Sequence, residues 1–354
     1  MEAIDVIKNL FSTCLIIISS LCYCYFISSR LPKGIFRLTS IIPIVIIFTI
    51  LPFHLCSAFA IFASSFSISW LCNFKLLLFA FDQGPLSSQR SKLSMLIFIT
   101  IAVLPIIITK EKKYPPKKMK FPLNLAIKAF LFPLLAEFLI NYRGTLSPLM
   151  LIVLFSVFIM FLVDILFFCY CSIGTYITGL EIDQPSNKPH LSTSVQEFWG
   201  KRWNAPVSNI LYSTICFPVR SASEKVLGKG LCSTCVGVMA SFVVSGLMHE
   251  LLYYHMTLVA TSWEVTLYFV MHGVVVSIEI VFKKRAKDKL RLNRFVSWLL
   301  TVGFFSISSW MVHFPQLIRS GVDLRLLEEY QICVEYLKTK ILDLSPLSGV
   351  TNLS

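Results

Sequence analysis

The chain has 354 residues, of which 56% are hydrophobic and only 14% are charged, and its mean hydropathy is +0.74. A soluble domain is nearer one quarter charged, and the hydrophobic residues here fall in blocks about 20 long, so the composition excludes an ordinary soluble protein and indicates a polytopic membrane protein. The net charge of +13 would suit a nucleic-acid-binding protein, but the basic residues lie beside the hydrophobic blocks, so membrane orientation and anionic lipid explain them better and we expect no nucleic-acid partner.

Five hydrophobic segments in the first half of the chain are predicted to cross the membrane. They span residues 10–27, 38–53, 55–71, 121–140 and 149–171. The residues ahead of the first segment carry Glu2, Asp5 and Lys8 and lack the basic start of a signal peptide, so this segment is predicted to be a retained anchor.

Two further segments in this region are predicted to enter the membrane without crossing it. Residues 73–85 contain Lys75 among apolar residues and end in a turn, which is typical of an interfacial helix whose lysine reaches the headgroups. Residues 94–109 form an apolar stretch of 16 residues, which reaches only about 24 Å as a helix and is interrupted by Pro105. We expect this second segment to be re-entrant or half-buried.

Three more spans are predicted in the second half, at residues 232–254, 263–282 and 295–312, which brings the expected number to about eight. The chain shows no internal repeat and no second domain, so residues 1–354 are predicted to form one integral-membrane domain with its motif-bearing core at about 121–312. The predicted fold class is an all-α, polytopic transmembrane helical bundle.

The positions of the basic residues predict the orientation of this bundle. If the segments 28–38, 73–120, 172–231 and 283–294 share one side, that side holds 25 of the 32 Lys and Arg residues. The positive-inside rule then places this side in the cytosol and both chain ends on the far side. The assignment requires that 94–109 does not cross, because otherwise the loop of six lysines that follows it falls on the wrong side.

One polar stripe marks the span at 232–254. Ser241, Ser245 and His249 recur every fourth residue, so they lie on one helix face, and an ionisable side chain at membrane depth is a functional-site hypothesis. The structural alternative is a histidine that hydrogen-bonds a neighbouring helix. Glu250 follows directly but points about 100° away on a helix, so it is not the obvious partner of His249.

Several motifs of metal-dependent and soluble enzymes are absent. The six histidines are too few and too scattered for a histidine-box di-iron site, and neither a Walker loop nor a Rossmann glycine pattern occurs. Ser245 lacks the first glycine of a nucleophile elbow. Cys232 and Cys235 have the spacing of half a zinc site, but no second pair exists, so we expect no metal and a structural role for these cysteines.

A second motif precedes the His249 span on the predicted cytosolic side. Residues 196–204 read Gln-Glu-Phe-Trp-Gly-Lys-Arg-Trp-Asn, and His249 follows 45 residues after Asn204. Together with residues 73–81 (Asn-Phe-Lys-Leu-Leu-Leu-Phe-Ala-Phe) and 245–250 (Ser-Gly-Leu-Met-His-Glu), this pattern resembles the membrane-bound O-acyltransferase superfamily and, within it, the plant wax synthases, or long-chain-alcohol O-fatty-acyltransferases. The resemblance covers essentially the whole chain.

The resemblance implies transfer of a fatty acyl group from acyl-CoA to a long-chain alcohol, forming a wax ester, by a multi-pass protein of the endoplasmic reticulum. It also implies re-entrant or interfacial helices around a buried catalytic chamber, membrane lipid as the surroundings, acyl-CoA as a substrate and no cofactor. An alcohol attacks a thioester slowly unless a base removes its proton, and a histidine kept neutral by low dielectric suits that role, so His249 is predicted to be the general base. Asn204 is predicted to hold the thioester carbonyl or the developing oxyanion, the alternative being a cap before Pro206.

Four residues around this asparagine are predicted to contact substrate, each with a structural alternative. Trp199 and Trp203 either stack against substrate or belong to an aromatic belt at the membrane interface. Lys201 and Arg202 either meet the CoA phosphates or mark the cytosolic edge of the bundle.

Two further candidates lie deeper in the bundle. Ser245 is predicted to line the substrate path or to support helix packing, and His272, seven residues before Glu279 on one helix face, is predicted to contact substrate or to be a hydrogen-bonded interior residue. His249 lies about 17 residues into its span, or roughly 25 Å, which is too deep for a CoA thioester at the surface. We therefore expect a cavity that reaches inward from the cytosolic face along Ser241 and Ser245.

Two alternatives stay open at this point. A sterol is an alternative acceptor for the same chemistry, because the related plant group includes sterol acylation and nothing in these motifs measures the shape of the acceptor. A membrane transporter, with the intramembrane charges forming a polar pathway, is the alternative of another class; the absence of repeats argues against it. For the transferase we expect one ternary complex without an acyl-enzyme, because the sequence offers no activated cysteine or serine.

Overall fold

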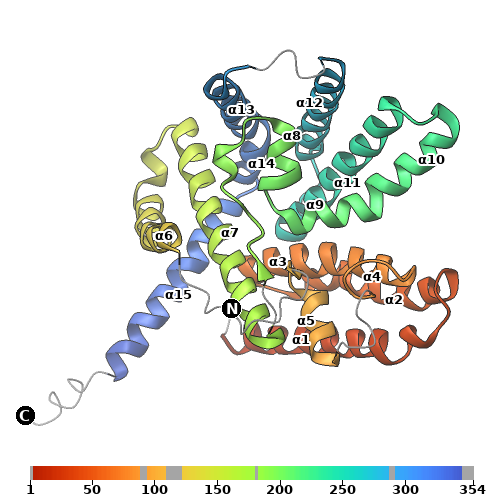
Figure 1. The fold of residues 1–354 in the computed structure, drawn as a ribbon. Helices are drawn as coiled ribbons and strands as arrows, with labels where there is room; N and C mark the ends of the chain where they lie inside the picture. The colour runs from red at the N-terminus through yellow and green to blue at the C-terminus, as the bar shows by residue number, and fades with distance from the viewer. Residues whose placement is uncertain (1–2, 88–93, 109–121, 180–181, 287–291, 345–354) are drawn as a thin grey trace, which may run out of the picture.

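The computed structural model describes residues 3–87, 94–108, 122–179, 182–286 and 292–344, which fold almost entirely into helices (Figure 1). Within these residues, eight helical stretches are long and apolar enough to cross a membrane, as the sequence predicts. They are Asp5–Arg30, Ile35–His54, Ala58–Ala80, Leu123–Thr145, Pro148–Thr178, Leu231–Thr257, Glu264–Ala286 and Arg294–Arg319. The expected all-α polytopic bundle is therefore confirmed.

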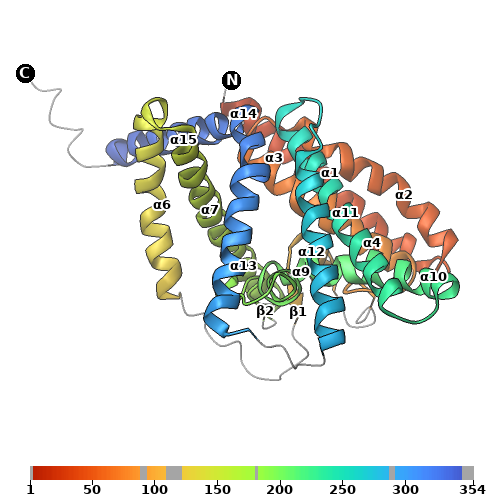
Figure 2. The ribbon, with the colours of Figure 1, turned by 90° about the horizontal axis from the view of Figure 1, so that it is seen from above.

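The first half of the chain supplies helices on both flanks of the bundle (Figure 2). Its helices are α1 (Ala3–Phe26), α2 (Ile35–Ile50), α3 (Ala58–Ser64), α4 (Asn73–Ala80), α5 (Met95–Val103), α6 (Leu123–Tyr142) and α7 (Pro148–Thr178). A π-helical stretch, Ser65–Cys72, joins α3 to α4 without a break. Helix α7 shows why such elements start and stop where they do, because the Ser147 side chain caps its first turn and Gly179 ends it in the left-handed conformation.

The second half alternates short helices with long ones. Its helices are α8 (Val195–Glu197), α9 (Ala205–Leu211), α10 (Phe217–Leu227), α11 (Leu231–Thr257), α12 (Glu264–Ala286), α13 (Arg294–Ser308), α14 (Phe314–Arg319) and α15 (Val322–Leu344). Three π-helical stretches, Phe198–Arg202, Tyr212–Cys216 and Ser309–His313, connect α8 to α9, α9 to α10 and α13 to α14. In Figure 2, α9 lies between the long helices rather than outside them.

One short antiparallel strand pair ties the two halves together. Strand β1 (Ile107–Ile108) pairs with β2 (Ile182–Asp183), with Ile107 opposite Asp183 and Ile108 opposite Ile182. The pair fixes the end of the α5 segment against the loop that follows α7. Helix α5 itself has nine residues and is about 14 Å long, so it is too short to cross, as the sequence predicts.

The prediction for the Lys75 segment is wrong. Helix α4 is not a separate interfacial helix but the last part of the span Ala58–Ala80, and the Lys75 side chain is fully buried. Its Nζ atom donates to the backbone carbonyls of Ile101 (2.6 Å) and Leu104 (2.6 Å) at the end of α5. A helix end leaves carbonyls without intrahelical partners, so a buried ammonium group at that place is satisfied by the backbone rather than by headgroups.

Contacts at one side of the bundle join the loops that the charge map places in the cytosol. Arg37, in the first turn of α2, donates to the carbonyl of Phe79 (3.1 Å) at the end of α4. On the other flank, the Trp298 indole of α13 donates to the carbonyl of His190 (2.8 Å). Together with the β1–β2 pair, these contacts place the described parts of the predicted cytosolic segments on one side.

Contacts at the opposite side join the loops predicted to be lumenal. Arg143, after α6, forms an ion pair with Asp323 of α15 (2.7 Å), and Arg319 of α14 forms one with Glu264 at the start of α12. Glu329 of α15 accepts hydrogen bonds from the hydroxyl of Ser57 (2.9 Å) and from the first amide groups of α3. Helix α15 thereby lies across the ends of α3 and α6 (Figure 2).

Two glycines let α11 and α12 pack closely, and this pair carries both histidines of interest. A Cβ atom on Gly246 of α11 would lie 2.8 Å from the Cα atom of Thr266, and one on Gly273 of α12 would lie 2.9 Å from the Phe242 Cβ atom. Small residues at such crossings allow close approach of membrane helices. His249 and His272 are therefore held on two helices whose relative position is tightly restricted.

Candidate active site

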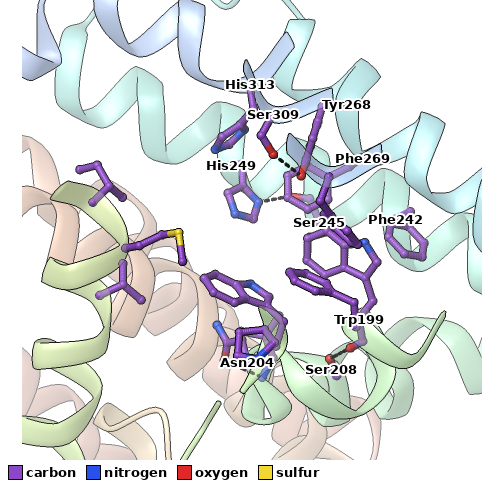
Figure 3. Close-up of a pocket in the computed structure, with 18 of the residues that line it drawn as sticks. Trp199, Asn204, Ser208, Phe242, Ser245, His249, Tyr268, Phe269, Ser309 and His313 are labelled. Atoms are coloured by element: carbon purple, nitrogen blue, oxygen red, sulfur yellow. Dashed lines mark hydrogen bonds between the residues drawn. The ribbon is translucent and has the colours of Figure 1, made fainter. Parts of the chain in front are cut away.

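A cavity of about 790 Å³ lies in the bundle, with α3, α7, α9, α11 and α12 and the Ser309–His313 stretch in its wall (Figure 3). Ser241, Ser245 and His249 of α11 all line it, as do Arg220 and Thr234 near the basic side. The predicted cavity along the serine stripe is therefore confirmed. It explains how a side chain 18 residues into α11, or about 27 Å, is reached from that side.

The imidazole of His249 is held in one tautomer by its own helix. Its Nδ1 atom lies 2.7 Å from the backbone carbonyl oxygen of Ser245, and because a carbonyl only accepts, Nδ1 carries the hydrogen. In the neutral ring Nε2 then has a free lone pair, and within the described residues it has no hydrogen-bond partner. The ring stacks on Phe269 (centroids 4.3 Å apart) and meets the edge of Trp70 (5.0 Å).

Asn204 combines a structural contact with a free donor. It adopts the left-handed conformation (φ 34°) as the N-cap of α9, and its Oδ1 atom accepts from the amide of Val207 (3.4 Å). The cap that the sequence allowed as an alternative is therefore present. The side chain is buried and lines the cavity, and within the described residues its Nδ2 group donates to no protein atom.

The two tryptophans of the motif form part of the cavity wall. Trp199 lies between Phe242 (centroids 5.8 Å apart) and Phe269 (5.5 Å), and its indole nitrogen points to His272. Trp203 stacks on Phe198 with an interplanar angle of 11°. Both rings are thus fixed by neighbouring side chains and present surface to the cavity.

Lys201 and Arg202, in contrast, do not line the cavity. Lys201 is exposed, whereas Arg202 is paired with Glu197 (2.7 Å) within the same segment. Burial alone would raise the pKa of the Glu197 carboxyl, but hydrogen bonds from Thr193 and Arg202 lower it below its usual value. Arg202 therefore stabilises the motif segment, and Lys201 is the cation of the pair that solvent reaches.

His272 also lies outside the cavity wall, and both of its ring nitrogens are occupied. Because an indole nitrogen only donates, Nδ1 accepts from Trp199 (3.1 Å), and Nε2 therefore carries the hydrogen and donates to Ser308 of α13 (3.1 Å). The interior hydrogen-bonded reading of His272 fits this geometry. On the same face of α12, Glu279 accepts from the amides of Val195 and Gln196 (both 3.0 Å), which are the first residues of α8.

Ser245 and Glu250 take the roles that the helix geometry allows. Ser245 is buried, lines the cavity and holds His249 through its backbone carbonyl rather than through its hydroxyl group. Glu250 turns to α12, where it accepts from the amide of Thr266 (3.0 Å). The prediction that Glu250 is not the partner of His249 agrees with this contact.

The sequence interpretation missed a polar group on the far side of His249 from the motif segment. Tyr268 of α12 lies within hydrogen-bond distance of Ser309 (Oη–Oγ, 3.1 Å), and the His313 ring lies 5.1 Å from the Tyr268 ring. All three residues line the cavity (Figure 3). The spacing of Ser306, Ser309 and His313 on one helix face could have indicated this group. His313, however, falls one residue beyond the end of the predicted span.

This arrangement is suited to removing a proton in an apolar enclosure. A neutral imidazole offers a lone pair at Nε2, and an amide donor lies at the wall of the same cavity. Among the residues that the structure describes, no three His, Cys, Asp or Glu side chains come together as a metal site would require. The groups present therefore support acid–base chemistry on a substrate with a long apolar part.

Comparison with known proteins agrees with this chemistry. Residues 184–271, which include the motif and His249, match the model of the membrane bound O-acyl transferase family. The chain is 36% identical over 340 residues to the probable long-chain-alcohol O-fatty-acyltransferase 3 of Arabidopsis thaliana, covering 95% of this chain and 97% of the relative. It is 36% identical to the long-chain-alcohol O-fatty-acyltransferase of Simmondsia chinensis (92% and 94% covered) and 35% identical to acyl-CoA–sterol O-acyltransferase 1 of Arabidopsis thaliana (89% and 92%).

Proposed function

The chain belongs to the membrane-bound O-acyltransferase family, and we propose that it transfers a fatty acyl group from acyl-CoA to the hydroxyl group of a long-chain alcohol, forming a wax ester. The proposal rests on the named activity of its relatives and on one observation above all. That observation is the His249 ring, whose Nδ1–H is held by a backbone carbonyl and whose Nε2 is free at the wall of an apolar cavity. The family membership argues against the transporter alternative.

His249 and Asn204 divide the chemistry between them. The alcohol gives its proton to Nε2 of His249 while its oxygen attacks the thioester carbon, so that the carbonyl oxygen becomes an oxyanion. Nδ2 of Asn204 donates to that oxyanion. The C–S bond then breaks, the ester is released, and the CoA thiolate takes the proton from His249, which returns to its neutral form. No acyl-enzyme and no cofactor enter this cycle.

The two substrates reach His249 from different directions. Acyl-CoA enters from the basic side, where Arg220 and Thr234 line the end of the cavity and the exposed Lys201 is available for CoA phosphates. The alcohol, which is apolar except at one end, enters from the bilayer. A multi-pass protein with this charge map is proposed to reside in the endoplasmic reticulum, with acyl-CoA supplied from the cytosol.

A sterol acceptor is the second candidate, because one relative of 35% identity is named an acyl-CoA–sterol O-acyltransferase. The catalytic step is the same for both acceptors, since each presents one hydroxyl group on an apolar body. The choice therefore depends on the shape of the cavity and not on His249 or Asn204.

One assay tests the activity and separates the acceptors. Purified protein in detergent or vesicles is given radiolabelled palmitoyl-CoA with fatty alcohols of increasing length, with a sterol or with no acceptor, and the lipid products are resolved by chromatography. We expect label in wax ester, at most weak label in sterol ester, and neither product from His249→Ala at matched amounts. Preferential sterol-ester formation selects the second candidate, and the absence of both esters rejects the proposal.

A further inference from the structure

Two polar side chains in the wall of the cavity lie close to His249. Tyr253 lies one helical turn after His249 on α11, and His313 lies opposite on the Ser309–His313 stretch, with ring centroids 6.0 Å apart. The His313 ring is also 6.3 Å from the His249 ring. Both Tyr253 and His313 line the cavity.

These two residues carry hydrogen-bonding atoms without partners. Oη of Tyr253 and Nδ1 of His313 are buried, and neither has a hydrogen-bond partner among the residues that the structure describes. Leaving a buried polar atom unpaired costs stability, and native proteins contain few such atoms. Neighbouring Tyr268 differs, because its hydroxyl group is already paired with Ser309.

We propose that Tyr253 and His313 hold the hydroxyl oxygen of the acceptor beside Nε2 of His249. This inference rests on the proposed function. The hydroxyl group of a long-chain alcohol is its single polar group, and its one hydrogen is directed at Nε2 for transfer. Its oxygen still accepts a hydrogen bond, which the Tyr253 hydroxyl or an imidazole N–H donates. The apolar remainder of the cavity receives the hydrocarbon chain.

Another unpartnered group near His249 offers a competing location. Nε1 of Trp70 is also buried without a partner among the described residues, and the Trp70 ring lies 5.0 Å from His249. Trp70 belongs to the Ser65–Cys72 stretch, and its ring contacts among the described residues are with Phe66 and His249. We assign the acceptor oxygen to the Tyr253–His313 side because two unpartnered groups converge there.

A pair of unreactive acceptor analogues tests the assignment. The methyl ether of a long-chain alcohol has an oxygen that accepts a hydrogen bond but no hydrogen to transfer, and an alkane of equal length has neither. Each is measured as an inhibitor of ester formation competing with the alcohol. For the wild type we expect the ether to bind about three- to tenfold more tightly than the alkane, as one hydrogen bond to a neutral group provides.

The variants remove the groups one at a time. Tyr253→Phe deletes only the hydroxyl group and His313→Leu removes the imidazole, and in each we expect the preference for ether over alkane to fall toward one, with a higher KM for the alcohol and an unchanged KM for acyl-CoA. His313→Gln covers the case in which the leucine variant does not fold. Tyr254→Phe is the matched control, because Tyr254 adjoins Tyr253 but is 40% exposed and does not line the cavity.

Failure of this inference is distinct from failure of the proposed function. If the wild type forms ester but Tyr253→Phe and the His313 variants keep the full ether preference, the inference is rejected and the function stands. Loss of the preference in Trp70→Phe alone moves the acceptor oxygen to the other side of His249 and also rejects it. A wild type that forms no ester with any alcohol rejects the proposed function itself.

Discussion

The orientation of the His249 ring depends on the backbone carbonyl of Ser245 and not on the Ser245 side chain. The carbonyl of Ser245 holds Nδ1–H and survives any substitution of the Ser245 side chain. Of these two residues, one helical turn apart, only His249 therefore needs its side chain for the proposed proton transfer. This distinction gives a paired test.

We expect His249→Ala to lower kcat by at least about 100-fold, because general-base catalysis contributes roughly 10²–10⁴-fold. Ser245→Ala should stay within a few-fold of the wild type, since the carbonyl acceptor is kept. The measurement is wax-ester formation by purified proteins at matched amounts. Near-normal turnover in His249→Ala would remove it as the base, and a loss in Ser245→Ala equal to that in His249→Ala would assign the hydroxyl group a direct role.

The two roles of Asn204, the capping of α9 by Oδ1 and the hydrogen-bond donation by Nδ2, can be separated by substitution. Asn204→Asp keeps an oxygen for the amide of Val207 and suits an N-cap, but replaces the Nδ2 donor with an acceptor. We expect its Tm to remain close to that of the wild type while kcat falls by about 10²–10³-fold, the usual cost of losing one oxyanion donor.

Asn204→Gly supplies the complementary control. Glycine tolerates the positive φ of 34° and is an acceptable N-cap but has no donor, so kcat should fall as in Asn204→Asp while Tm changes little. Full activity in Asn204→Asp would contradict the donor role and leave Asn204 as a cap alone.

At the scale of the element, one face of α12 contacts the motif segment at residues 195–199. His272 accepts from the Trp199 indole and Glu279 accepts from the first amides of α8, seven residues away along the same helix face. The two contacts fix both ends of the segment that contains Trp199 and leads to Asn204. The histidine that the sequence offered as a second substrate contact thus acts on the wall of the cavity through Trp199.

In the first half of the chain, the contribution of Lys75 to stability can be tested directly. Lys75→Met keeps an unbranched side chain of similar length but leaves the carbonyls of Ile101 and Leu104 without their donor. We expect a loss of about 1–3 kcal/mol of stability, as for other buried groups left unpaired. Thermal unfolding in detergent measures it, with Lys229→Met, at an exposed loop position, as the matched control. Equal Tm values for the two variants would mean that the Lys75 contacts do not stabilise α5.

At the scale of the molecule, the features that depend on composition and on the spacing of residues along a helix could be predicted from the sequence. Span number and position follow from long apolar blocks, and the line from Ser241 to His249 follows from helical spacing. The destination of Lys75 could not be predicted in this way, because it depends on where the end of α5 lies in space. His313 could be predicted only in part, because its spacing from Ser306 and Ser309 places it on their helix face, but the π-helical stretch that brings it to His249 cannot be predicted from that spacing.

The contacts between distant loops could not be predicted from the sequence either, yet they agree with the division of the loops by their basic residues. Basic residues alone divided the loops into two sets, and the hydrogen bonds and ion pairs join loops within a set. Arg143 pairs with Asp323 within the predicted lumenal set, and Arg319 of that set pairs with Glu264 at the adjoining end of a predicted span. Trp298, near the end of the predicted span that adjoins the basic segment 283–294, donates to His190 of the predicted cytosolic set. Which set faces the cytosol stays a prediction.

That orientation decides which compartment supplies acyl-CoA, and glycosylation reporters test it. The loop at Lys229 is exposed and belongs to the basic side, whereas residues 182–204 form contacts of the motif segment that an insertion would disturb. A reporter sequence inserted at Lys229 should remain unmodified in microsomes, because 25 of the 32 basic residues direct its side to the cytosol. The same reporter appended after Ser354 should be glycosylated and become sensitive to endoglycosidase. A modified Lys229 reporter with an unmodified C-terminal one would invert the orientation, and acyl-CoA would then have to reach the cavity from the lumen.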